Sequence, residues 1–333
     1  MIELTGYSAL ASIPQYMLNN LERIEDINED TKFFLALEDI ETYCDKLLLL
    51  SKAQEHITMY GITGNILKTY STELLNTCAI ELTVHTDAVV ALEGISDWVM
   101  KIYNAIRDAI DKIIEWIRTD SYFSRWTNKC ERYRVKIGEL MATVVRQHSV
   151  VNELIYRTHR IVGHPYSNCT ELISTATNIA NKLNTVTTTN KFGELNIIDI
   201  FGADLLKCGF TVDSGVLQRP TSLGMKTATI GDLLWNPQKV YATGPSIITL
   251  LSKHTFIDKL IYSLKRSIRN TETQLNSLIR TNSTDPVAIN NMKKEIAGMK
   301  CIRMISVYTI DISSSLAYQW INMANKFTIA KGK

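Results

Sequence analysis

The stretch DWVMKIYNAIRDAIDKIIEWIR, residues 97–118, decides the fold class of this chain. Its apolar residues recur every three or four positions, which places them on one face of an α-helix. They are Trp98, Ile102, Ile106, Ala109, Ile110, Ile113 and Ile117. The opposite face carries four basic and three acidic side chains, unlike the one-sided basic face of a lipid-binding helix. We therefore expect a long helix that packs against other protein segments.

Helical spacing of apolar residues continues on both sides of this stretch. It predicts helices over residues 19–54, 66–93, 138–184 and 246–280, the last with a nearly heptad, coiled-coil-like seam. The sequence TNSTDP, residues 281–286, interrupts the pattern, and Pro286 suits the first turn of a following helix. Two antiparallel helices are expected there. The predicted fold is mainly α, a long-helix bundle.

One section departs from this pattern. Residues 186–244 contain seven glycines together with Pro220 and Pro237, which favours short pieces. The sequence therefore predicts a small irregular or β-hairpin insert there. The expected organisation is an acidic helical segment, an amphipathic and basic helical region, the insert and a basic helical hairpin, over residues 1–93, 94–185, 186–244 and 245–333.

Composition supports a helical protein with a real core. Six prolines and fifteen glycines in 333 residues leave few helix breakers. The six cysteines form no CxxC pair, which indicates a reducing compartment. The opening residues lack the basic and apolar regions of a secretory signal, so export by that route is not expected. The nearly uncharged stretch 304–325 contains Asp311 and three consecutive serines, and we expect a buried or half-buried helix there.

The net charge of +2 conceals a strong asymmetry along the chain. Residues 1–93 hold fifteen acidic and five basic side chains, so the remainder carries about +12. The basic part includes an aromatic and cationic cluster, SYFSRWTNKCERYRVK, that follows the opening stretch. Such neighbours suit stacking on bases and contacts with phosphates, but they also suit the edge of an aromatic core. The nucleic-acid candidates are Arg125, Trp126, Lys129, Arg132, Arg134, Lys265, Arg266 and Arg269.

Motifs for catalysis or cofactor binding are absent from the sequence. It contains no P-loop, GxGxxG, GxSxG or HExxH pattern, so we predict no catalytic residues, no metal site and no cofactor. His159, His164 and Cys169 form the closest group of metal-binding residue types, but their spacing and Pro165 argue against a shared site. His254 is expected to be a core histidine with satisfied hydrogen bonds.

The order of features from residue 94 to 300 resembles the internal head proteins of large-genome tailed bacteriophages. The opening helix and its SYFSRW sequel, then LLKCGFTVDSGVLQRP, TATIGDLLW and the basic hairpin carry this resemblance. It implies a virion structural protein that is made in the host cytoplasm and lies inside the capsid, with packaged DNA or capsid proteins as partners. A homo-oligomer is a further expectation. The alternative from another class is a membrane-active helical protein, ejected from the virion or pore-forming.

The resemblance also implies processing by a phage head protease, which favours a small residue, any residue and then glutamate. Five such triplets occur, and all lie in the first 93 residues. They end at Glu38, Glu55, Glu73, Glu81 and Glu93. Cleavage after Glu93 would remove the acidic segment as a propeptide and leave a basic protein.

Overall fold

Helices make up most of the computed structural model, which confirms the mainly α fold class. The structure describes residues 21–83, 85–119, 122–143, 160–161, 169–189, 191–208, 210–213, 216–218, 228–229 and 237–329. The helices are α1 (Leu21–Tyr60), α2 (Gly64–Cys78), α3 (Ala88–Thr119), α4 (Tyr122–Thr143), α5 (Cys169–Val186), the short 3₁₀ helix η3 (Phe192–Glu194), α6 (Ile197–Lys207), α8 (Pro237–Ser252), α9 (Phe256–Thr281) and α10 (Pro286–Ile329). The strands are β1 (Arg160–Ile161), β2 (Thr211–Asp213), β3 (Val216–Gln218) and β4 (Ala228–Thr229).

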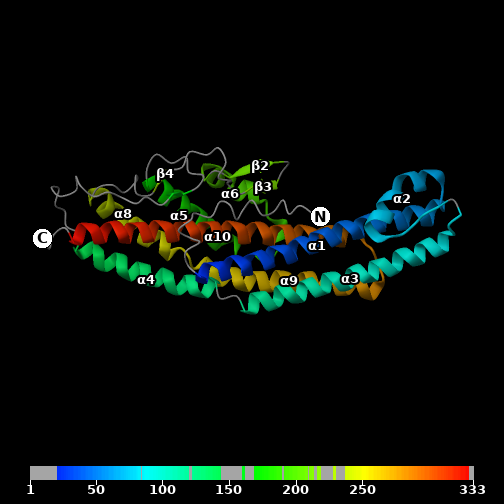
Figure 1. Ribbon diagram of the computed structural model, residues 1–333, viewed down its shortest axis with the longest axis horizontal. Helices are drawn as coiled ribbons and strands as arrows, with labels where there is room; N and C mark the ends of the chain where they lie inside the picture. Colours follow the sequence, from blue (N-terminus) through cyan, green and yellow to red (C-terminus); the bar gives the residue numbers. More distant parts are fainter. Residues whose placement is uncertain are drawn as a thin grey trace.

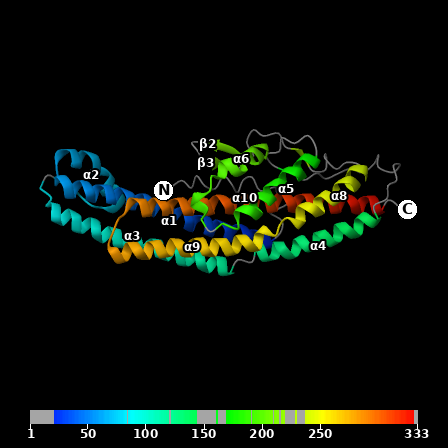
Figure 2. The ribbon, with the colours of Figure 1, turned by 180° about the vertical axis from the view of Figure 1, so that it is seen from behind.

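The molecule is an elongated bundle, and α10 runs along most of its length (Figures 1 and 2). A straight helix of 44 residues such as α10 is about 66 Å long. Helix α1 lies antiparallel to α10, because Asp45 pairs with Lys293 at 2.5 Å and the earlier Glu38 pairs with the later Lys300 at 2.9 Å. Helices α3 and α4 follow one another along one long edge, α9 lies along the same edge, and α2 forms one end.

Most side chains of residues 302–320 of α10 are buried, which confirms the buried helix expected there. The hydroxyl groups of Ser306, Thr309 and Ser313 donate hydrogen bonds to carbonyls four residues earlier, at 2.7 to 2.8 Å. These bonds satisfy polar groups that would otherwise be costly to bury. The opening stretch also behaves as expected: Ile102, Ile106, Ala109, Ile110, Ile113 and Ile117 are buried, and Trp98 is half-buried.

The single helix predicted over residues 66–93 is wrong, because two helices with a connection between them occupy this range. Helix α2 ends at Cys78, and Ala79 adopts a left-handed conformation with φ of 50°. Helix α3 begins at Ala88 after Asp87, whose carboxylate accepts a hydrogen bond from the Val89 N–H at 2.7 Å. The threonines between them are weak helix formers, so a left-handed cap and an aspartate cap divide the range.

The helix predicted over residues 246–280 is also interrupted. Helix α8 ends at Ser252, residues 253–255 form a turn, and α9 begins at Phe256. The amide of Asn184 on α5 donates a hydrogen bond to the Lys253 carbonyl at 2.6 Å, and its oxygen accepts one from the Thr255 hydroxyl at 2.8 Å. A partner distant in sequence thus satisfies backbone and side-chain groups in the turn, and no local pattern could indicate that partner.

The predicted hairpin of two antiparallel helices is present as α9 and α10. Asn282 ends α9 in a left-handed conformation, and Pro286 is the first residue of α10. Hydrogen bonds hold this turn against other helices: the Tyr103 hydroxyl of α3 donates to the Ser283 carbonyl at 2.5 Å, and the Ser51 hydroxyl of α1 donates to the Thr284 carbonyl at 2.8 Å. Burial raises the pKa of Tyr103 to about 12, so the phenol remains a donor.

The described part of residues 186–244 contains η3, α6, the start of α8 and short strands. Strand β2 pairs antiparallel with β3, with Val212 opposite Leu217, and β1 pairs antiparallel with β4. Much of the remaining insert lies outside the described residues. The expected boundary after Glu93 falls within α3, and the boundary after Gly244 falls within α8, so neither coincides with the end of a helix.

Candidate nucleic-acid interface and the buried polar contacts behind it

Of the predicted nucleic-acid-binding residues, the three on α9 are all exposed: Lys265, Arg266 and Arg269. Helix α9 contains five basic and two acidic side chains, and it buries apolar residues on its opposite side. Figure 2 shows α9 along the lower long edge of the bundle. Five exposed residues within positions 259–269 lie on one side of this helix, and we call them the α9 face: Lys259, Tyr262, Lys265, Arg266 and Arg269.

An aromatic side chain lies within this basic face. Tyr262 is 64% exposed, with Lys259 and Lys265 three residues away on either side and Arg266 four residues further along. Residues three and four apart are neighbours on a helix surface. Sequence reasoning identified Lys265, Arg266 and Arg269 but missed Lys259 and Tyr262. Their helical spacing relative to Arg266 was the signal that could have found them.

The predicted residues on α4 divide between the surface and the interior. Lys129 and Arg132 are exposed, whereas Arg125 is half-buried. Arg134 pairs with Glu131 at 2.7 Å, and Lys136 pairs with Glu139 at 3.4 Å, so acidic neighbours offset part of the local positive charge. Helix α4 is therefore a weaker candidate for phosphate contacts than α9.

Trp126 does not lie on the surface, which corrects its assignment as a stacking partner for bases. The side chain is 4% exposed, and its indole N–H donates a hydrogen bond to Nδ1 of His254 at 3.2 Å. The helical periodicity of α4 turns the aromatic residues of SYFSRW inward, with Phe123 also buried, and leaves Lys129 and Arg132 outside. The cluster is thus the edge of an aromatic core, the alternative considered beside nucleic-acid contact.

His254 is a core histidine with satisfied hydrogen bonds, as predicted. Since Nδ1 accepts from Trp126, the ring proton belongs on Nε2, which donates to the Ser313 hydroxyl at 2.8 Å. The Ser313 hydroxyl in turn donates to the Thr309 carbonyl at 2.8 Å. This chain of hydrogen bonds links α4, the turn between α8 and α9, and α10. The Ser313 hydroxyl therefore donates its proton to a backbone carbonyl and not to the imidazole, and the imidazole has a fixed tautomer.

Burial lowers the pKa of His254 from its ordinary 6.5 to about 3. The unfolded chain therefore binds a proton at His254 below pH 6.5, whereas the folded protein does not until about pH 3. We expect the free energy of unfolding to fall by up to about 1.4 kcal/mol for each pH unit below 6.5. Denaturant unfolding at pH 7 and at pH 5.5, above the range in which most carboxylates titrate, measures this loss.

A His254→Gln variant provides the control for this prediction, because glutamine does not titrate. We expect the variant to be less stable than the wild type at pH 7 but to lose less stability between pH 7 and pH 5.5. Equal losses in the two proteins would contradict a neutral, buried His254.

Arg303 on α10 is a buried cation that sequence reasoning missed. Its side chain is fully buried, with its guanidinium carbon 4.1 Å from the ring centre of Phe123 and 4.2 Å from that of Trp116. The Phe33 ring on α1 lies 5.4 Å away. Faces of aromatic rings attract a guanidinium, and the attraction is stronger away from water. Arg303 therefore joins α1, α3, α4 and α10 within the core.

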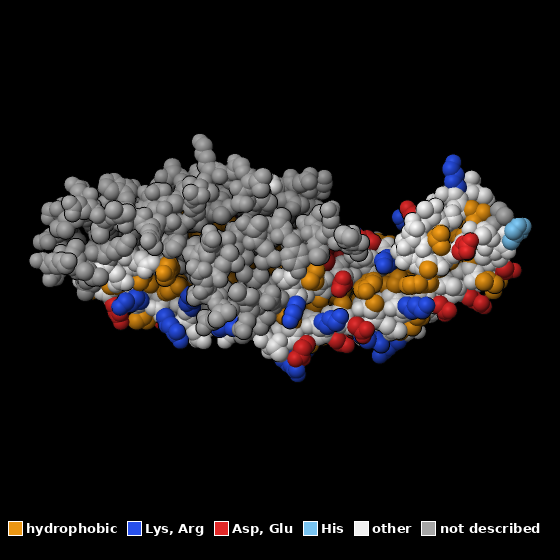
Figure 3. Space-filling view, viewed as in Figure 1, with side chains coloured by type: hydrophobic (Ala, Val, Ile, Leu, Met, Phe, Trp, Pro, Cys, Tyr) orange, Lys and Arg blue, Asp and Glu red, His pale blue; other side chains and the backbone are white. Residues whose placement is uncertain are grey.

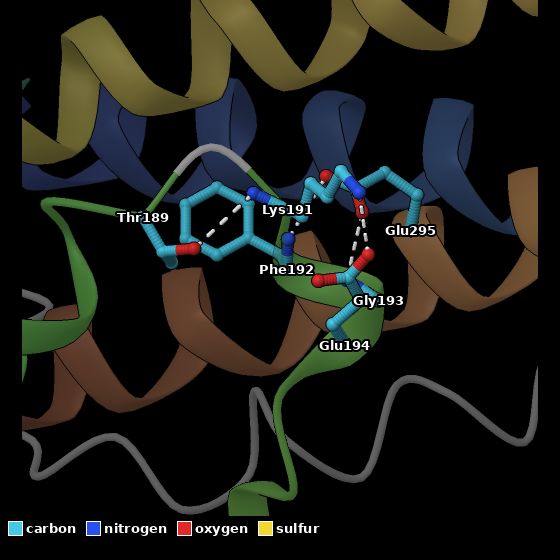
Figure 4. A network of polar contacts seen from close by, with 6 residues as sticks. All are labelled: Thr189, Lys191, Phe192, Gly193, Glu194 and Glu295. Carbon is cyan, nitrogen blue, oxygen red and sulfur yellow. Dashed lines mark hydrogen bonds and ion pairs between the residues drawn. The ribbon is translucent and has the colours of Figure 1, made fainter.

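Glu295 on α10 holds the short helix η3 in place (Figure 4). Its carboxylate accepts hydrogen bonds from the backbone N–H groups of Phe192 at 3.0 Å and Gly193 at 2.7 Å, and from the hydroxyl of Ser267 on α9. The backbones approach so closely that a Cβ on Gly193 would lie 2.7 Å from the Glu295 nitrogen. All three donors point at one carboxylate, so Glu295 has a positioning role within the fold.

The acidic segment is part of the same core as the basic helices. In α1, Leu37, Ile40, Cys44, Leu47 and Leu50 are fully buried. Its carboxylates Glu38 and Glu41 contact Lys300 at 2.9 and 3.3 Å, and Asp45 contacts Lys293. The charge asymmetry along the sequence is thus partly balanced within the fold, by pairs between α1 and α10. Removal of residues 1–93 would expose the surfaces of α3 and α10 that pack against α1.

The five predicted processing sites differ in their local structure. Glu38 and Glu55 lie in α1, Glu73 lies in α2, and Glu93 lies in α3. Glu81 is exposed in the non-helical connection between α2 and α3. Whether a protease acts at any of them stays a prediction.

Among these five sites, we expect a glutamate-specific protease to cut first after Glu81, because exposed connections are cleaved more readily than helices. Brief digestion of the folded protein, followed by mass spectrometry, would detect a fragment that begins at Leu82. A Glu81→Gln variant should lose this fragment while cleavage elsewhere is unchanged. Earlier cleavage after Glu38 or Glu93 would contradict the expectation.

The cysteines whose side chains the structure describes are all free thiols: Cys44, Cys78, Cys130, Cys208 and Cys301. Burial raises the pKa of Cys44 and Cys130 to about 12, which keeps these thiols protonated and unreactive. The Cys130 thiol donates to the Leu251 carbonyl at 3.3 Å, next to the turn that contains His254. These observations give the thiols packing roles.

Two further predictions concern metal sites and membrane spans. Within the described ranges, no group of three or more His, Cys, Asp or Glu side chains is placed to hold a metal ion. His148, His159 and His164 and the side chain of Cys169 lie outside those ranges. None of the helices in the described part of the chain is long and apolar enough to cross a membrane.

Comparison with models of known protein families, with curated proteins and with solved structures finds no match to this chain.

Proposed function

We propose that this chain is a structural protein of a tailed-bacteriophage virion, and that it acts inside the head by binding packaged DNA or inner capsid proteins rather than by catalysis. The exposed α9 face carries this proposal. It presents four basic side chains and Tyr262 on one side of a helix whose other side is anchored in the core. The sequence resemblance to internal head proteins supports the same role.

The α9 face suits a nucleic acid for electrostatic reasons. Its basic residues span ten positions, or about 15 Å along the helix axis, and duplex DNA carries one phosphate charge for about every 1.7 Å of its axis. Several phosphates therefore lie within reach of this face. Binding would release condensed counterions, which favours association at low salt. Tyr262 adds a flat surface on which an unpaired base could stack.

The pairing of the acidic segment leaves the α9 face available. Within the described part of the chain, the ion pairs of α1 are made with Lys293 and Lys300 on α10, and none is made with Lys265, Arg266 or Arg269. The α1 carboxylates therefore offset positive charge on α10 rather than on the α9 face.

Replacing Lys265, Arg266 and Arg269 with glutamine is expected to lower the affinity for DNA and to make that affinity less dependent on salt concentration. Loss of three phosphate contacts would reduce the slope of log K against log salt concentration by about 2 to 3. Fluorescence anisotropy with labelled DNA over a range of salt concentrations measures this slope. A matched control replaces Lys101, Lys112 and Arg118, three exposed residues on α3, with glutamine and should leave the slope nearly unchanged.

Equal effects of the two triple substitutions would contradict a specific role for the α9 face. Location in the virion is tested separately, by mass spectrometry of purified particles. That measurement reports whether the protein is present and whether it retains its acidic segment. Absence from the particles would overturn the virion role, whatever the DNA affinity.

The membrane-active alternative depends on two stretches whose apolar sides are buried in the described fold. Ile102, Ile106 and Ile113 of α3 face the core, as do most residues between 302 and 320 of α10. Membrane activity would therefore require the bundle to open. Leakage from liposomes that is strong and insensitive to salt, without retention of DNA, would favour this alternative over the proposed role.

A further inference from the structure

One end of the molecule exposes several large apolar side chains. Large hydrophobic residues are exposed at the end of α1, on α2 and at the start of α3, and Met59, Tyr60 and Val89 are each more than 60% exposed. Leu75 and Val90 belong to the same end of the bundle. Figure 3 shows hydrophobic and acidic side chains together at this end. We call the surface formed by residues 52–97 the α2 end.

The α2 end is also acidic. It contains six exposed carboxylates but only two lysines, Lys52 and Lys68. They are Glu55, Glu73, Glu81, Asp87, Glu93 and Asp97. Within the described ranges, none of the six forms an ion pair with a lysine or arginine. The α2 end thus combines apolar contact area with a negative charge that its two lysines only partly offset.

The α9 face has the complementary properties. It combines four basic residues with the exposed ring of Tyr262, and one exposed carboxylate, Asp258, lies on the same side of the helix. Its residues lie in the first half of α9, near the middle of the molecule, while the second half of α9 runs toward the α2 end (Figures 1 and 2). Within one molecule the two surfaces are therefore separated along the bundle, and they can meet only between molecules.

We propose that the α2 end of one molecule binds the α9 face of a second copy of this chain. Apolar contacts with Tyr262 would add to the attraction between the carboxylates and the basic residues. Because two different surfaces meet, each pair of bound molecules keeps one free α2 end and one free α9 face. Contacts of this kind lead to open chains or rings rather than to a closed twofold dimer. The contact uses the face that the proposed function assigns to DNA, but it does not depend on DNA binding.

Sedimentation velocity of the full chain tests this contact. At about 0.05 M salt we expect species larger than a monomer that grow with protein concentration, and at about 0.5 M salt we expect monomers, because salt screens exposed charges. A chain that stays monomeric at low salt and high concentration would overturn the proposal. Assembly that persists unchanged at high salt would also overturn it, since charge complementarity would not be its cause.

Charge substitutions identify the surfaces. The pair Glu81→Lys with Glu93→Lys leaves four acidic and four basic side chains at the α2 end, and the pair Lys265→Glu with Arg266→Glu leaves two of each sign on the α9 face, so each pair neutralises its surface. Each double variant alone should be monomeric at low salt, and so should a chain with all four substitutions. A mixture of the two double variants should form only one-to-one complexes, because one keeps the wild-type α9 face and the other keeps the wild-type α2 end. Failure of the mixture to form these complexes would overturn the proposal.

The same variants separate this inference from the proposed function. All four positions are exposed, and circular dichroism confirms that each variant is folded. The variant neutralised at the α2 end should bind DNA as the wild type does, and DNA added to wild-type assemblies should dissociate them by competing for the α9 face. A wild-type chain that assembles but does not bind DNA would contradict only the proposed function. A wild-type chain that stays monomeric at low salt and still binds DNA through the α9 face would contradict only the present inference.

Discussion

Replacing Gly298 with alanine is expected to destabilise the protein by about 2 to 3 kcal/mol, although alanine favours a helix more than glycine does. A Cβ at this position of α10 would lie 2.6 Å from the carbonyl carbon of Phe192 and still closer to its oxygen. These are backbone atoms of η3, held by Glu295, so they cannot move aside as a flexible side chain could. The substitution would push η3 away from α10 and weaken the hydrogen bonds to Glu295.

Two other helical glycines provide matched controls for Gly298. A Cβ on Gly94 of α3 or on Gly138 of α4 would meet no atom within 4 Å in the described fold. Alanine at either position should stabilise the protein by about 0.5 to 1 kcal/mol, because glycine loses more conformational freedom in a helix. Urea denaturation measures all three variants. If Gly298→Ala behaved like the two controls, the close approach of η3 to α10 would be wrong.

Replacing Arg303 with alanine is expected to cost about 3 to 5 kcal/mol of unfolding free energy, from a cavity within the core and from lost contacts with aromatic rings. The Trp116 and Phe123 rings would lose the guanidinium that lies about 4 Å from their centres. Lysine at the same position should also destabilise the protein, because a compact ammonium group does not stack as a planar guanidinium does. Chemical denaturation with far-UV circular dichroism measures both changes.

The control for Arg303 is an exposed arginine, Arg266 of the α9 face. Its replacement with alanine should change stability by no more than about 0.5 kcal/mol, because surface side chains contribute little. A fluorescence readout is also available, since Trp116 contacts Arg303 directly and its emission should change in the Arg303 variants. An Arg303→Ala protein as stable as the Arg266→Ala protein would contradict the structural role.

The predicted and observed helices agree where packing repeats a local pattern. The apolar spacing of residues 97–118 predicts α3, and the proline that ends TNSTDP predicts the hairpin of α9 and α10, because local sequence carries both signals. The same reasoning failed where a contact distant in sequence acts. The break between α8 and α9 depends on Asn184, which is 69 residues from Lys253. Helical periodicity across residues 246–280 contains no sign of that contact.

The candidate site divides in the same way. Lys265, Arg266 and Arg269 could be assigned to a surface because they alternate with apolar residues along one helix. Trp126 belongs to an equally suggestive cluster but lies in the core, where His254 accepts its N–H. Which face of α4 is covered depends on α8 and α10, so a composition of aromatic and basic residues does not distinguish a surface from a core edge.

The sequence alone determined the helical class of this protein, the position of its hairpin and the separation of acidic from basic residues along the chain. Those properties follow from local periodicity, helix caps and composition, and each can be evaluated within a few turns. Only the tertiary structure decided which charged side chains are buried and which pair with one another. Arg303 is buried among aromatic rings from three helices, while α1 carboxylates pair with lysines of α10 more than 240 residues away. The free energy of a charged group depends on its surroundings in space, and those surroundings exist only after the chain has folded.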